Sequence, residues 1–584
     1  MRLSLGLRRA PEQVATVETV ILAALTLEER RHHAFHTTLS DSNTVALGKL
    51  QTLKGYWCPS DGIEDAWNNF LAQRKLSEAD LLNLARPIGL KGLPLRWTTI
   101  LRGIMRELEG RHSRPHYRNR LAESLAFPLV QYAMAQCFRS RYSSPEFAIS
   151  TCVQAAFKNC LLNRLANTIR QVAAWELQIF RATPNSNGGN LSGYPLKDAI
   201  QLLLSSGVET EILRLLHSYP ALARLWAIQI IHWARFARKF LNHSALFLKQ
   251  PAPGRHGSIA LLECDRSDLH NGNQSVVHVV TLSGQDWFYK PRSGEAEWAW
   301  FALLRWLNEE GFDAPFKILT VELGRAHCWI EAIRPSSCST VADAALYYFR
   351  AGAILFLAHV LRGVDFHAGN VIAHGSQPVI VDCETLLHPI GHSSNKLRPE
   401  ESSVLRTGML PAQLGSEEGL EDFSALGCRR LGPHSVRLRG RSLHVSEFVE
   451  DLIKGFRRMR AFLCESEVRQ ITFVAKLRQL GPSRCRHIHR PTSHYSAIRT
   501  YSLSHRALKD GLERSVLLNA ACRHSAVASR YRSKEVYALQ DVDIPIFRGN
   551  SASPLFLNGV ESVEASVATI RKACFYRKPE REVD

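Results

Sequence analysis

The chain has 584 residues, of which 45% are hydrophobic, so it can bury a large core and form two to four structural units. Its longest apolar run, residues 351–361 interrupted by His359, is shorter than the ~20 residues of a membrane-spanning helix. The apolar stretch at residues 3–7 is too short for the core of a signal peptide. We therefore expect a cytoplasmic protein without a membrane span.

The formal net charge of +19 would by itself permit binding to nucleic acid. The basic residues are spread along the chain, however, without a long Lys/Arg block or a familiar nucleic-acid motif. We predict no nucleic-acid partner and a generally basic surface that serves phosphates or an acidic peptide. The 13 cysteines include no Cys-x-x-Cys pair, so neither a disulfide framework nor a zinc ribbon is indicated.

Residues 1–250 are predicted to be mostly helical, because apolar residues recur there at intervals of three and four. The clearest helical segments are 14–27, 63–71, 121–137, 152–177, 196–216 and 221–241. A stretch rich in Asn, Ser and Gly, residues 184–193, is expected to form a surface loop between two of these helices.

From about residue 255 the pattern alternates, which predicts three consecutive strands between residues 258 and 290. Lys290 then lies at the end of the third strand, the place from which a kinase lysine reaches the triphosphate. A solvent-exposed lysine is the alternative for this residue. The sequence leaves its acidic partner open between two nearby glutamates, Glu295 and Glu297.

The segment at 342–361 is predicted to be a buried helix, since it is apolar on nearly all sides, and Gly363 ends it. A β-hairpin is predicted after it, in which residues 371–373 pair with 378–381. This pairing would bring Asn370 and Asp382 side by side at the open end of the hairpin.

The polar residues around this hairpin are those of a phosphoryl-transfer site. One Asp can orient and deprotonate an attacking hydroxyl, while an Asn and a second Asp can supply oxygen ligands to Mg²⁺. A surface hairpin with solvated carboxylates is the alternative, but an acidic pair directly after the second strand favours phosphoryl transfer. The candidate residues are Asp365, His367, Asn370, Asp382 and Glu384.

The second chemically informative stretch is CRHIHRPTSHY, residues 485–495. Arg486, Arg490 and Thr492 lie close together on this basic, partly extended segment, and Pro491 restrains the residue before it. An arginine offers a bidentate fork to phosphate oxygens, and a neighbouring hydroxyl can donate to the same group. The stretch is therefore a candidate phosphate site, with a solvated basic strand as the alternative.

The loop GVDFHAGN and the strand end DCETL resemble the kinase-type signature of class II lanthipeptide synthetases, the LanM enzymes, within their dehydratase domain. Further motifs occur in the family's order, so the resemblance covers about residues 215–560. One departure is Gly369, which stands where the family usually has Glu and leaves the role of that Glu unfilled. The further motifs lie at 289–293, 303–308, 328–333, 403–411, 422–427, 486–492 and 542–555.

The resemblance implies an α+β fold, with a helical N-terminal region at 1–250 and a lipid-kinase-like two-lobed core at 251–584. The N-lobe would span about 255–335, with residues 328–333 as its edge strand and adenine hinge. The C-lobe and the elimination region would span about 336–584. The full synthetases continue into a zinc-binding cyclase domain that has no counterpart in this sequence, so we expect a stand-alone or truncated dehydratase.

The resemblance further implies that ATP with Mg²⁺ phosphorylates Ser or Thr of a precursor peptide that carries a leader segment. Lys290 would hold the phosphates, and Asp365 would act on the peptide hydroxyl with the support of His367. The metal would be held by Asn370, Asp382 and Glu384.

Elimination of the phosphate would then give dehydroalanine or dehydrobutyrine. Phosphate is a far better leaving group than hydroxide, so phosphorylation followed by loss of the α-proton is chemically sensible. The family carries an Arg and a Thr, six positions apart, that are associated with this step, and they match Arg486 and Thr492. Asp268 and His270 fall at the family's spacing and are the candidate bases.

Two alternatives stay open beside this interpretation. The first is a kinase that phosphorylates a small molecule or a peptide without elimination. The second is a non-catalytic, peptide-binding remnant of a truncated synthetase. Product mass separates the three, because phosphorylation adds mass, complete dehydration removes the mass of water, and a remnant changes nothing. The dehydratase interpretation would add a separate cyclase as a partner.

Overall fold

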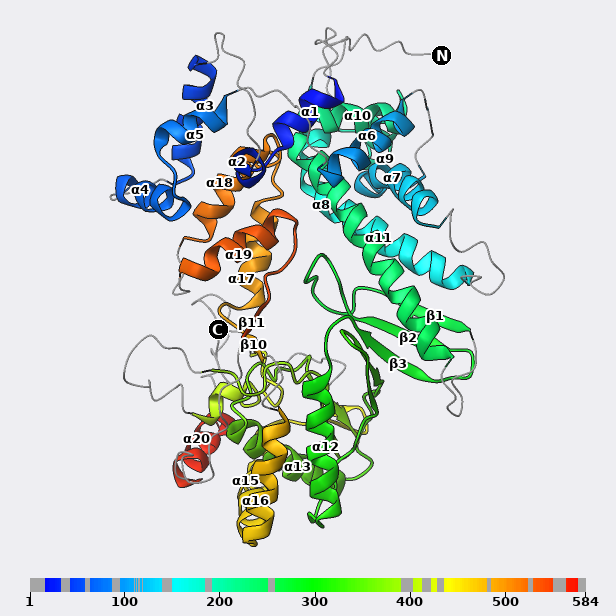
Figure 1. Ribbon diagram of the computed structural model, residues 1–584. Coiled ribbons are helices and arrows are strands. Elements are labelled where there is room, and N and C mark those ends of the chain that lie inside the picture. The colour runs from blue at the N-terminus through cyan, green and yellow to red at the C-terminus, as the bar shows by residue number, and fades with distance from the viewer. Residues whose placement is uncertain are drawn as a thin grey trace, which may run out of the picture. The chain divides into compact units, whose positions relative to one another are not determined.

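The structure is a computed structural model of the chain (Figure 1). Two predicted features lie partly outside the described residues. They are the loop at 184–193, of which only the last two residues are described, and the motif at 542–555, of which the end is not described. The described residues are 16–32, 43–57, 63–86, 95–109, 111, 113, 116–117, 119–138, 150–183, 192–249, 258–389, 403–411, 422–427, 435–480, 485–523, 529–549 and 563–575.

Contacts between residues divide the chain into two compact units. Unit 1 comprises residues 1–285 and 489–545, and unit 2 comprises 286–488 and 546–584. The chain therefore enters unit 2, returns to unit 1, and ends in unit 2. The predicted domain boundary at residue 250 stays a prediction.

Unit 1 is mainly helical, as its apolar periodicity predicted. Its two longest helices pack through buried tryptophans of α11, where Trp226 donates to Leu165 O at 3.2 Å and Trp233 to Phe157 O at 3.0 Å. The helices are α1 (Val17–Ala24), α2 (Leu27–His32), α3 (Asn43–Gly55), α4 (Ile63–Arg74), α5 (Glu78–Ala85), α6 (Arg96–Leu108), α7 (Leu121–Phe138), α8 (Thr151–Ala182), α9 (Leu196–Leu203), α10 (Val208–Ser218), α11 (Pro220–Leu248), α17 (Thr492–Tyr501), α18 (Gly511–Ala521) and α19 (Ser529–Gln540).

One predicted helix of unit 1 is two helices in the structure. The segment 196–216 divides into α9 and α10, with residues 204–207 between them. Gly207 has a φ of +105°, which is far from the helical value and readily adopted only by glycine. The prediction of one continuous helix was wrong. The spacing of apolar residues does not reveal one glycine that leaves the helical conformation.

The three strands predicted between residues 258 and 290 are confirmed. In unit 1, β1 (Ile259–Glu263) pairs antiparallel with β2 (Val277–Thr281). In unit 2, β3 (Asp286–Lys290) pairs with β5 (Cys328–Glu331), and β5 also pairs with β4 (Val321–Leu323). The expectation that 328–333 forms an edge strand was therefore wrong, since β5 has a partner on both sides. The three-residue strand β4 is too short to give an alternating pattern.

The core of unit 2 surrounds α13 (Val341–Val360), which confirms the predicted buried helix. By length and composition α13 could cross a membrane, but 67% of its most apolar 18-residue window is buried inside the protein. Thr340 caps the helix, because its hydroxyl accepts from Asp343 N at 3.1 Å while the Asp343 carboxylate accepts from Thr340 N at 2.9 Å. This helix is therefore the central core element of unit 2.

The remaining elements of unit 2 pack around α13 or follow it in the chain. Among them α15 makes the most extensive contact with α13. They are α12 (Glu295–Glu309), β6 (Val371–His374), β7 (Gln377–Ile380), η2 (Val404–Thr407), β8 (Arg437–Leu438), β9 (Arg441–Ser442), η3 (Val445–Glu447), α15 (Val449–Cys464), α16 (Glu467–Leu480), β10 (Cys485–His487), β11 (Phe547–Gly549) and α20 (Val563–Phe575).

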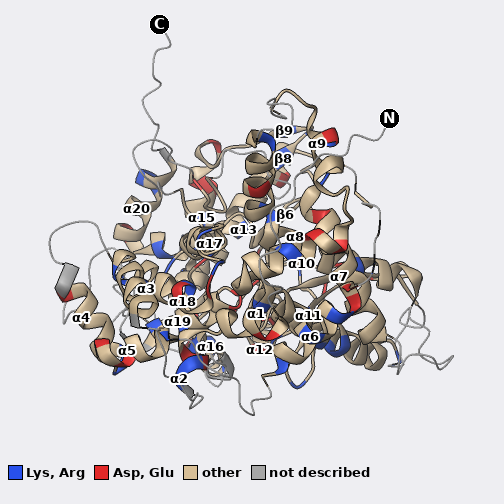
Figure 2. Ribbon diagram, turned by 90° about the horizontal axis from the view of Figure 1, so that it is seen from above, with Lys and Arg blue, Asp and Glu red and all other residues tan. Residues whose placement is uncertain are grey.

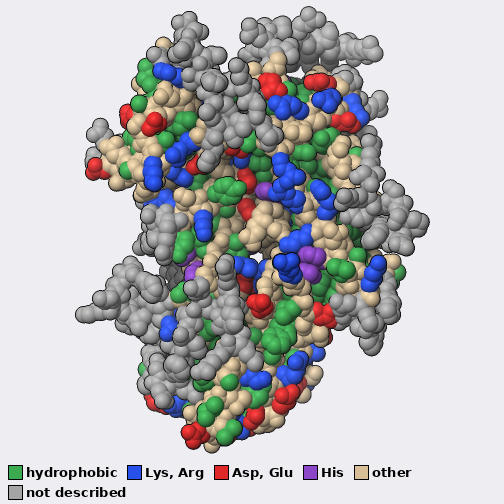
Figure 3. All heavy atoms as spheres, in the orientation of Figure 1, with side chains coloured by type: hydrophobic (Ala, Val, Ile, Leu, Met, Phe, Trp, Pro, Cys, Tyr) green, Lys and Arg blue, Asp and Glu red, His purple; other side chains and the backbone are tan. Residues whose placement is uncertain are grey.

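The charged residues are distributed over many elements. Figure 2 shows Lys and Arg on many of the helices, interspersed with Asp and Glu. On the face drawn in Figure 3, basic side chains form several small groups separated by apolar and acidic ones. The excess of positive charge is thus spread out, as its distribution along the sequence indicates.

Candidate active site

The β6–β7 hairpin positions the first two polar residues of the site. Its register is the predicted one, with Val371 opposite Ile380 and Ala373 opposite Pro378. The turn is tighter than expected and consists of residues 375 and 376, where Gly375 has a φ of +56°. At the open end, Val381 N donates to Asn370 O at 3.0 Å. Asn370 and Asp382 therefore emerge from adjacent ends of the same hairpin.

The loop before the hairpin is held by two later segments. Phe366 N donates to Thr407 O at 3.0 Å, and Ala368 N donates to Phe423 O at 2.9 Å. These acceptors belong to 403–411 and 422–427, the two motifs that follow the hairpin in the sequence. Asp365 has a φ of +66°, a conformation that is uncommon for any residue except glycine. The surrounding hydrogen bonds hold Asp365 in this strained position.

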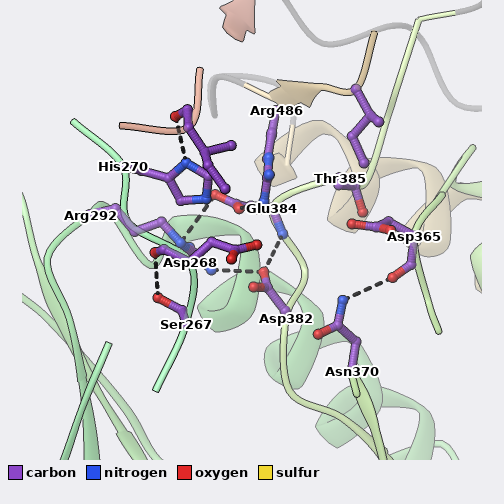
Figure 4. A network of polar contacts seen from close by, with 12 residues as sticks. Ser267, Asp268, His270, Arg292, Asp365, Asn370, Asp382, Glu384, Thr385 and Arg486 are labelled. Atoms are coloured by element: carbon purple, nitrogen blue, oxygen red, sulfur yellow. Dashed lines mark hydrogen bonds and ion pairs between the residues drawn. The ribbon is translucent and has the colours of Figure 1, made fainter. Parts of the chain in front are cut away.

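Asp365, His367 and Asn370 lie together in this loop (Figure 4 shows Asp365 and Asn370). The Asn370 side-chain amide donates to Asp365 O at 2.9 Å, and no described residue bonds to Asn370 Oδ1. Gly369 N donates to His367 Nδ1 at 3.0 Å, and His367 Nε2 lies 3.3 Å from Asn370 Nδ2 and 4.0 Å from Asp365 Oδ1. Asn370 thus keeps an oxygen for a ligand, and the His367 ring is held beside both Asp365 and Asn370.

The environment of Asp365 raises the pKa of its carboxyl group above the ordinary value. Burial is the largest cause that raises the pKa of this carboxyl, and the charges of Asp382 and Glu384 add to it. His367 and Arg486 oppose the shift without cancelling it. A carboxylate with a raised pKa is a better proton acceptor, which suits the predicted role of Asp365 as a base.

Gly369 also explains a departure from the family pattern in structural terms. A Cβ atom at this position would lie 2.9 Å from Cε1 and 3.1 Å from Nδ1 of the His367 ring. Such a side chain would push the ring away from the backbone amide that now donates to it. The glycine is therefore part of how this chain orients His367.

Lys290 is a buried residue with a defined acidic partner. Its Nζ lies 3.0 Å from Glu297 Oε1, donates to Val381 O at 2.7 Å, and lies 3.9 Å from Asp382 Oδ2. Its exposed fraction is 6%, which excludes the alternative of a surface lysine. Of the two candidate partners, Glu297 is fully buried on α12 and Glu295 is exposed. Burial lowers the pKa of Lys290, but the charges of Asp382 and Glu297 outweigh it and raise the pKa.

Arg292, which the sequence analysis did not identify, joins the acidic residues of the site (Figure 4). Its guanidinium bonds to Glu297 through Nη1 at 3.1 Å and to Asp382 Oδ1 through Nη2 at 2.8 Å. Its Nε lies 3.1 Å from Glu384 Oε2. The only sequence signal for this residue is its position two residues after Lys290 in the YKPRS motif.

Glu384 is held by arginines from three segments of unit 2. Arg486 on β10 lies 2.8 Å from Oε1, and Arg548 on β11 lies 3.3 Å from Oε2, the oxygen that Arg292 also contacts. Arg486 N further donates to Glu384 O at 2.7 Å. Burial raises the pKa of Glu384, but the charges of the three arginines outweigh it and hold the pKa at about 2. Arg548 was also absent from the predicted site residues.

The predicted metal ligands differ in how available they are. Among the described residues, no group of three or more His, Cys, Asp or Glu side chains is arranged to hold a metal ion. Asn370 Oδ1 has no partner in the described part of the chain, and Asp382 shares its carboxylate with Arg292. Both oxygens of Glu384 contact arginines. The residues fit a magnesium site built on Asn370 and Asp382, and a ligand role for Glu384 stays a prediction.

The remaining predicted site residues belong to unit 1. His270 Nδ1 lies 2.9 Å from Ile544 O, so the neutral ring is protonated at Nδ1 and has its lone pair at Nε2. Asp268 is exposed, and its carboxylate bonds to no described residue. Thr492 is the first residue of α17, and its hydroxyl has no hydrogen-bond partner in the described part of the chain.

Arg490 does not share the environment of Arg486, although the two are four residues apart. It belongs to unit 1, where its Nε donates to Glu535 Oε1 at 2.9 Å and its Nη2 to Cys522 O at 3.1 Å. Glu535 is fully buried, and Tyr495 donates to the same oxygen at 2.7 Å. Arg490 therefore serves the packing of unit 1, and its sequence-based grouping with Arg486 as a phosphate fork was wrong.

Comparison with known proteins places the chain in a family. Residues 219–436 and 428–550, more than half of the chain, match the family described as "Domain of unknown function (DUF4135)", and the chain belongs to that family. The chain is also similar to the lacticin 481/lactococcin biosynthesis protein LcnDR2 of Lactococcus lactis subsp. lactis. The two are 23% identical over an alignment of 312 residues, and the match covers 45% of this chain and 33% of that protein. The resemblance to lanthipeptide synthetases is thus supported at the level of the family.

Proposed function

We propose that the chain acts in lanthipeptide biosynthesis as a dehydratase that phosphorylates Ser or Thr of a precursor peptide and then eliminates phosphate. The observation that carries the proposal is the buried Lys290–Glu297 ion pair beside Asp382, with Asp365 and Asn370 on the adjoining loop. Protein kinases use a strand lysine paired with a helix glutamate, a metal-binding Asp, and a catalytic loop that carries an Asp and an Asn. The proposal includes a two-lobed core like that of lipid kinases.

In the phosphorylation step, Asp365 accepts the proton of the peptide hydroxyl while the hydroxyl oxygen bonds to the γ-phosphorus of ATP. The bond from that phosphorus to the bridging oxygen breaks, and ADP leaves with the electron pair. Lys290 holds the phosphates as a point charge, and His367 Nε2 lies 4.0 Å from Asp365 Oδ1. Mg²⁺, when bound to Asn370 and Asp382, supplies positive charge against the triphosphate.

In the elimination step, a base removes the α-proton of the phosphorylated residue. The electron pair of that Cα–H bond forms the Cα–Cβ double bond, the Cβ–O bond breaks, and phosphate leaves with its electrons. His270 and Asp268 are the candidate bases. Arg486 and Thr492 stabilise the departing phosphate. We further propose that the enzyme acts in the cytoplasm.

Separating the two half-reactions tests the proposal. A candidate precursor peptide is co-expressed with the chain and with two variants, Arg486→Met and Thr492→Ala, and the peptide is analysed by mass spectrometry. Loss of one phosphate-stabilising donor slows such a step by roughly 10²- to 10³-fold. Both variants are therefore expected to release peptide that is phosphorylated but not dehydrated. Arg571→Met, which alters an exposed ion pair with Glu450, is the control and should dehydrate normally.

The other outcomes distinguish the alternatives. Unmodified peptide from both Arg486→Met and Thr492→Ala would assign the segment to phosphorylation or folding. Normal dehydration by both would remove these residues from the elimination site. If the unaltered chain yields only phosphorylated peptide, it is a kinase without elimination, and if it changes no precursor, the proposed function is wrong.

A further inference from the structure

Two arginines in unit 2 face each other directly across a two-stranded sheet. In the antiparallel pairing of β10 with β11, Arg486 is opposite Arg548. Side chains at directly opposed positions lie on the same face of a sheet, about 5 Å apart at their Cβ atoms, and like charges there are destabilising. This arrangement therefore requires an anion between the two guanidinium groups.

Glu384 is the anion that fills this place. Its Oε1 lies 2.8 Å from Arg486 Nη1 and its Oε2 lies 3.3 Å from Arg548 Nη2, so the carboxylate bridges the opposed pair. Arg292 approaches Oε2 as well, with its Nε at 3.1 Å. Three guanidinium groups thus surround one carboxylate that is 9% exposed.

Arg292 has further acidic partners in Glu297 and Asp382, whereas the side chains of Arg486 and Arg548 bond only to Glu384 among the described residues. Each guanidinium has five N–H groups, whereas a carboxylate offers two oxygens and a single charge. Arg548 Nε is buried and has no hydrogen-bond partner among the described residues. Buried polar groups are rarely left without a partner, so such an orphan requires an explanation such as an absent ion.

The charge balance agrees with this donor excess. Burial is the largest cause that lowers the pKa of Arg548. The charges of Arg292 and Arg486 lower this pKa further, and the opposite charge of Glu384 does not cancel the shift. For Arg486, burial also lowers the pKa, but the charge of Glu384 and its hydrogen bond outweigh burial and raise it. Arg548 is therefore the member of the trio whose positive charge is least compensated.

We propose that Arg486, Arg548 and Arg292 form a binding site for a phosphate oxyanion, in which the Glu384 carboxylate is a placeholder that phosphate displaces. Phosphate carries more oxygens and more charge than a carboxylate, and it matches the planar fork of arginine. The site would take either free phosphate or the phosphate group of a phosphorylated residue. This inference rests on the proposed function, because elimination needs a place for the phosphate that leaves the peptide.

The assignment adds two residues to the proposed site and gives Glu384 a different role. Arg548 and Arg292 become phosphate-binding residues beside Arg486. Glu384 becomes a carboxylate that competes with phosphate for that site. This role is an alternative to its predicted role as a metal ligand. Its removal should then strengthen the binding of phosphate, whereas removal of a metal ligand would leave phosphate binding in the absence of metal unchanged.

Isothermal titration calorimetry on the full chain, without ATP or metal, tests the site with two probes. The probes are inorganic phosphate and a short synthetic phosphoserine peptide, with the unphosphorylated peptide as a blank. The variants are Glu384→Gln, Arg548→Met and Arg548→Lys, and Arg571→Met is the matched control in the same unit. Far-UV circular dichroism checks that each variant is folded.

We expect Glu384→Gln to bind inorganic phosphate roughly tenfold more tightly than the unaltered chain, because the competing carboxylate is gone. Arg548→Met should bind it at least tenfold more weakly, Arg548→Lys should be intermediate, and Arg571→Met should be unchanged. Tighter binding of the phosphoserine peptide than of free phosphate would identify the peptide-borne group as the ligand. The reverse order would identify the free phosphate product.

The inference is overturned if Glu384→Gln fails to increase phosphate affinity, or if both Arg548 variants bind like the unaltered chain. The Glu384→Gln arm decides the question even where Arg548→Met does not fold. Phosphate binding with the expected pattern in a chain that never modifies a precursor would sink the proposed function and leave the site standing. Dehydration of a precursor by a chain that lacks this binding pattern would overturn the phosphate site and leave the proposed function standing.

Discussion

At the scale of single residues, the buried Lys290–Glu297 pair is the feature most sensitive to substitution. Glu297 is fully buried and faces both Lys290 and Arg292, with contacts at 3.0 and 3.1 Å. Glu297→Gln removes a charge that compensates two buried cations, and loss of one partner of a buried pair costs about 3–5 kcal/mol. We expect a destabilisation near the lower end of that range, because Asp382 still faces both cations, and loss of phosphorylation.

Chemical denaturation followed by tryptophan fluorescence measures the first effect, and mass spectrometry of a co-expressed precursor measures the second. Glu295→Gln is the matched control, since Glu295 is exposed on the first turn of the same helix and should leave both quantities unchanged. Equal stability of Glu297→Gln and the unaltered chain would show that the pair is not important for folding.

The residues that sequence analysis found are those whose chemistry depends on nearby neighbours in the chain. Lys290, Asn370 and Asp382 stand at strand ends that alternation and turn signals locate, so their positions were predictable. Arg548 was missed because its partner on the opposite strand, Arg486, is far away in sequence and the pairing of β10 with β11 has no local signature. Which acid pairs with Lys290 was also undecided, because only burial distinguishes Glu297 from Glu295.

At the scale of elements, local patterns predicted the β6–β7 hairpin and the buried helix α13 correctly. A hairpin with a two-residue turn and an apolar helix each depend on a short stretch of sequence. The break between α9 and α10 was missed because one glycine with a positive φ interrupts an apolar pattern that continues on either side. The interior position of β5 was missed because its neighbour β4 is only three residues long.

The crossing of α13 and α15 gives a prediction at this scale. A Cβ atom at Gly352 would lie 1.9 Å from Leu452 O, and one at Gly455 would lie 1.8 Å from Phe349 O. Each helix therefore presents a glycine to the backbone of the other. Gly455→Ala must push the helices apart, and we expect it to destabilise the chain by about 1–3 kcal/mol or more, the cost of overpacking a core.

Gly48→Ala is the control for this substitution. Gly48 lies inside α3, is exposed, and has no atom within 4 Å of a built Cβ. Alanine there should stabilise the chain by roughly 0.5–1 kcal/mol, because it favours the helix without a clash. Thermal unfolding of both variants gives the comparison. A Gly455→Ala variant as stable as the unaltered chain would mean that the crossing relaxes without loss of packing.

At the scale of the whole molecule, the excess of positive charge bears on how a peptide substrate is recruited. The net charge is +19, and Figures 2 and 3 show its carriers on many elements with acidic residues between them. A distributed charge of this kind attracts an acidic peptide over a distance without requiring one specific contact. The sequence could predict this property, because it depends on the number and spacing of the charged residues and only weakly on the fold.

If the basic surface recruits an acidic leader segment, the affinity for that segment depends on salt. The Debye length falls from about 10 Å at 0.1 M salt to about 3 Å at 1 M, so attraction between exposed charges is progressively screened. Fluorescence anisotropy of a labelled acidic peptide should therefore give a dissociation constant that rises roughly tenfold as salt increases across the physiological range. A peptide of the same length with Lys in place of each Glu is the control and should bind at no salt concentration. An affinity that stays constant with salt would instead indicate recognition through an apolar groove, and the charge would then have no part in recruitment.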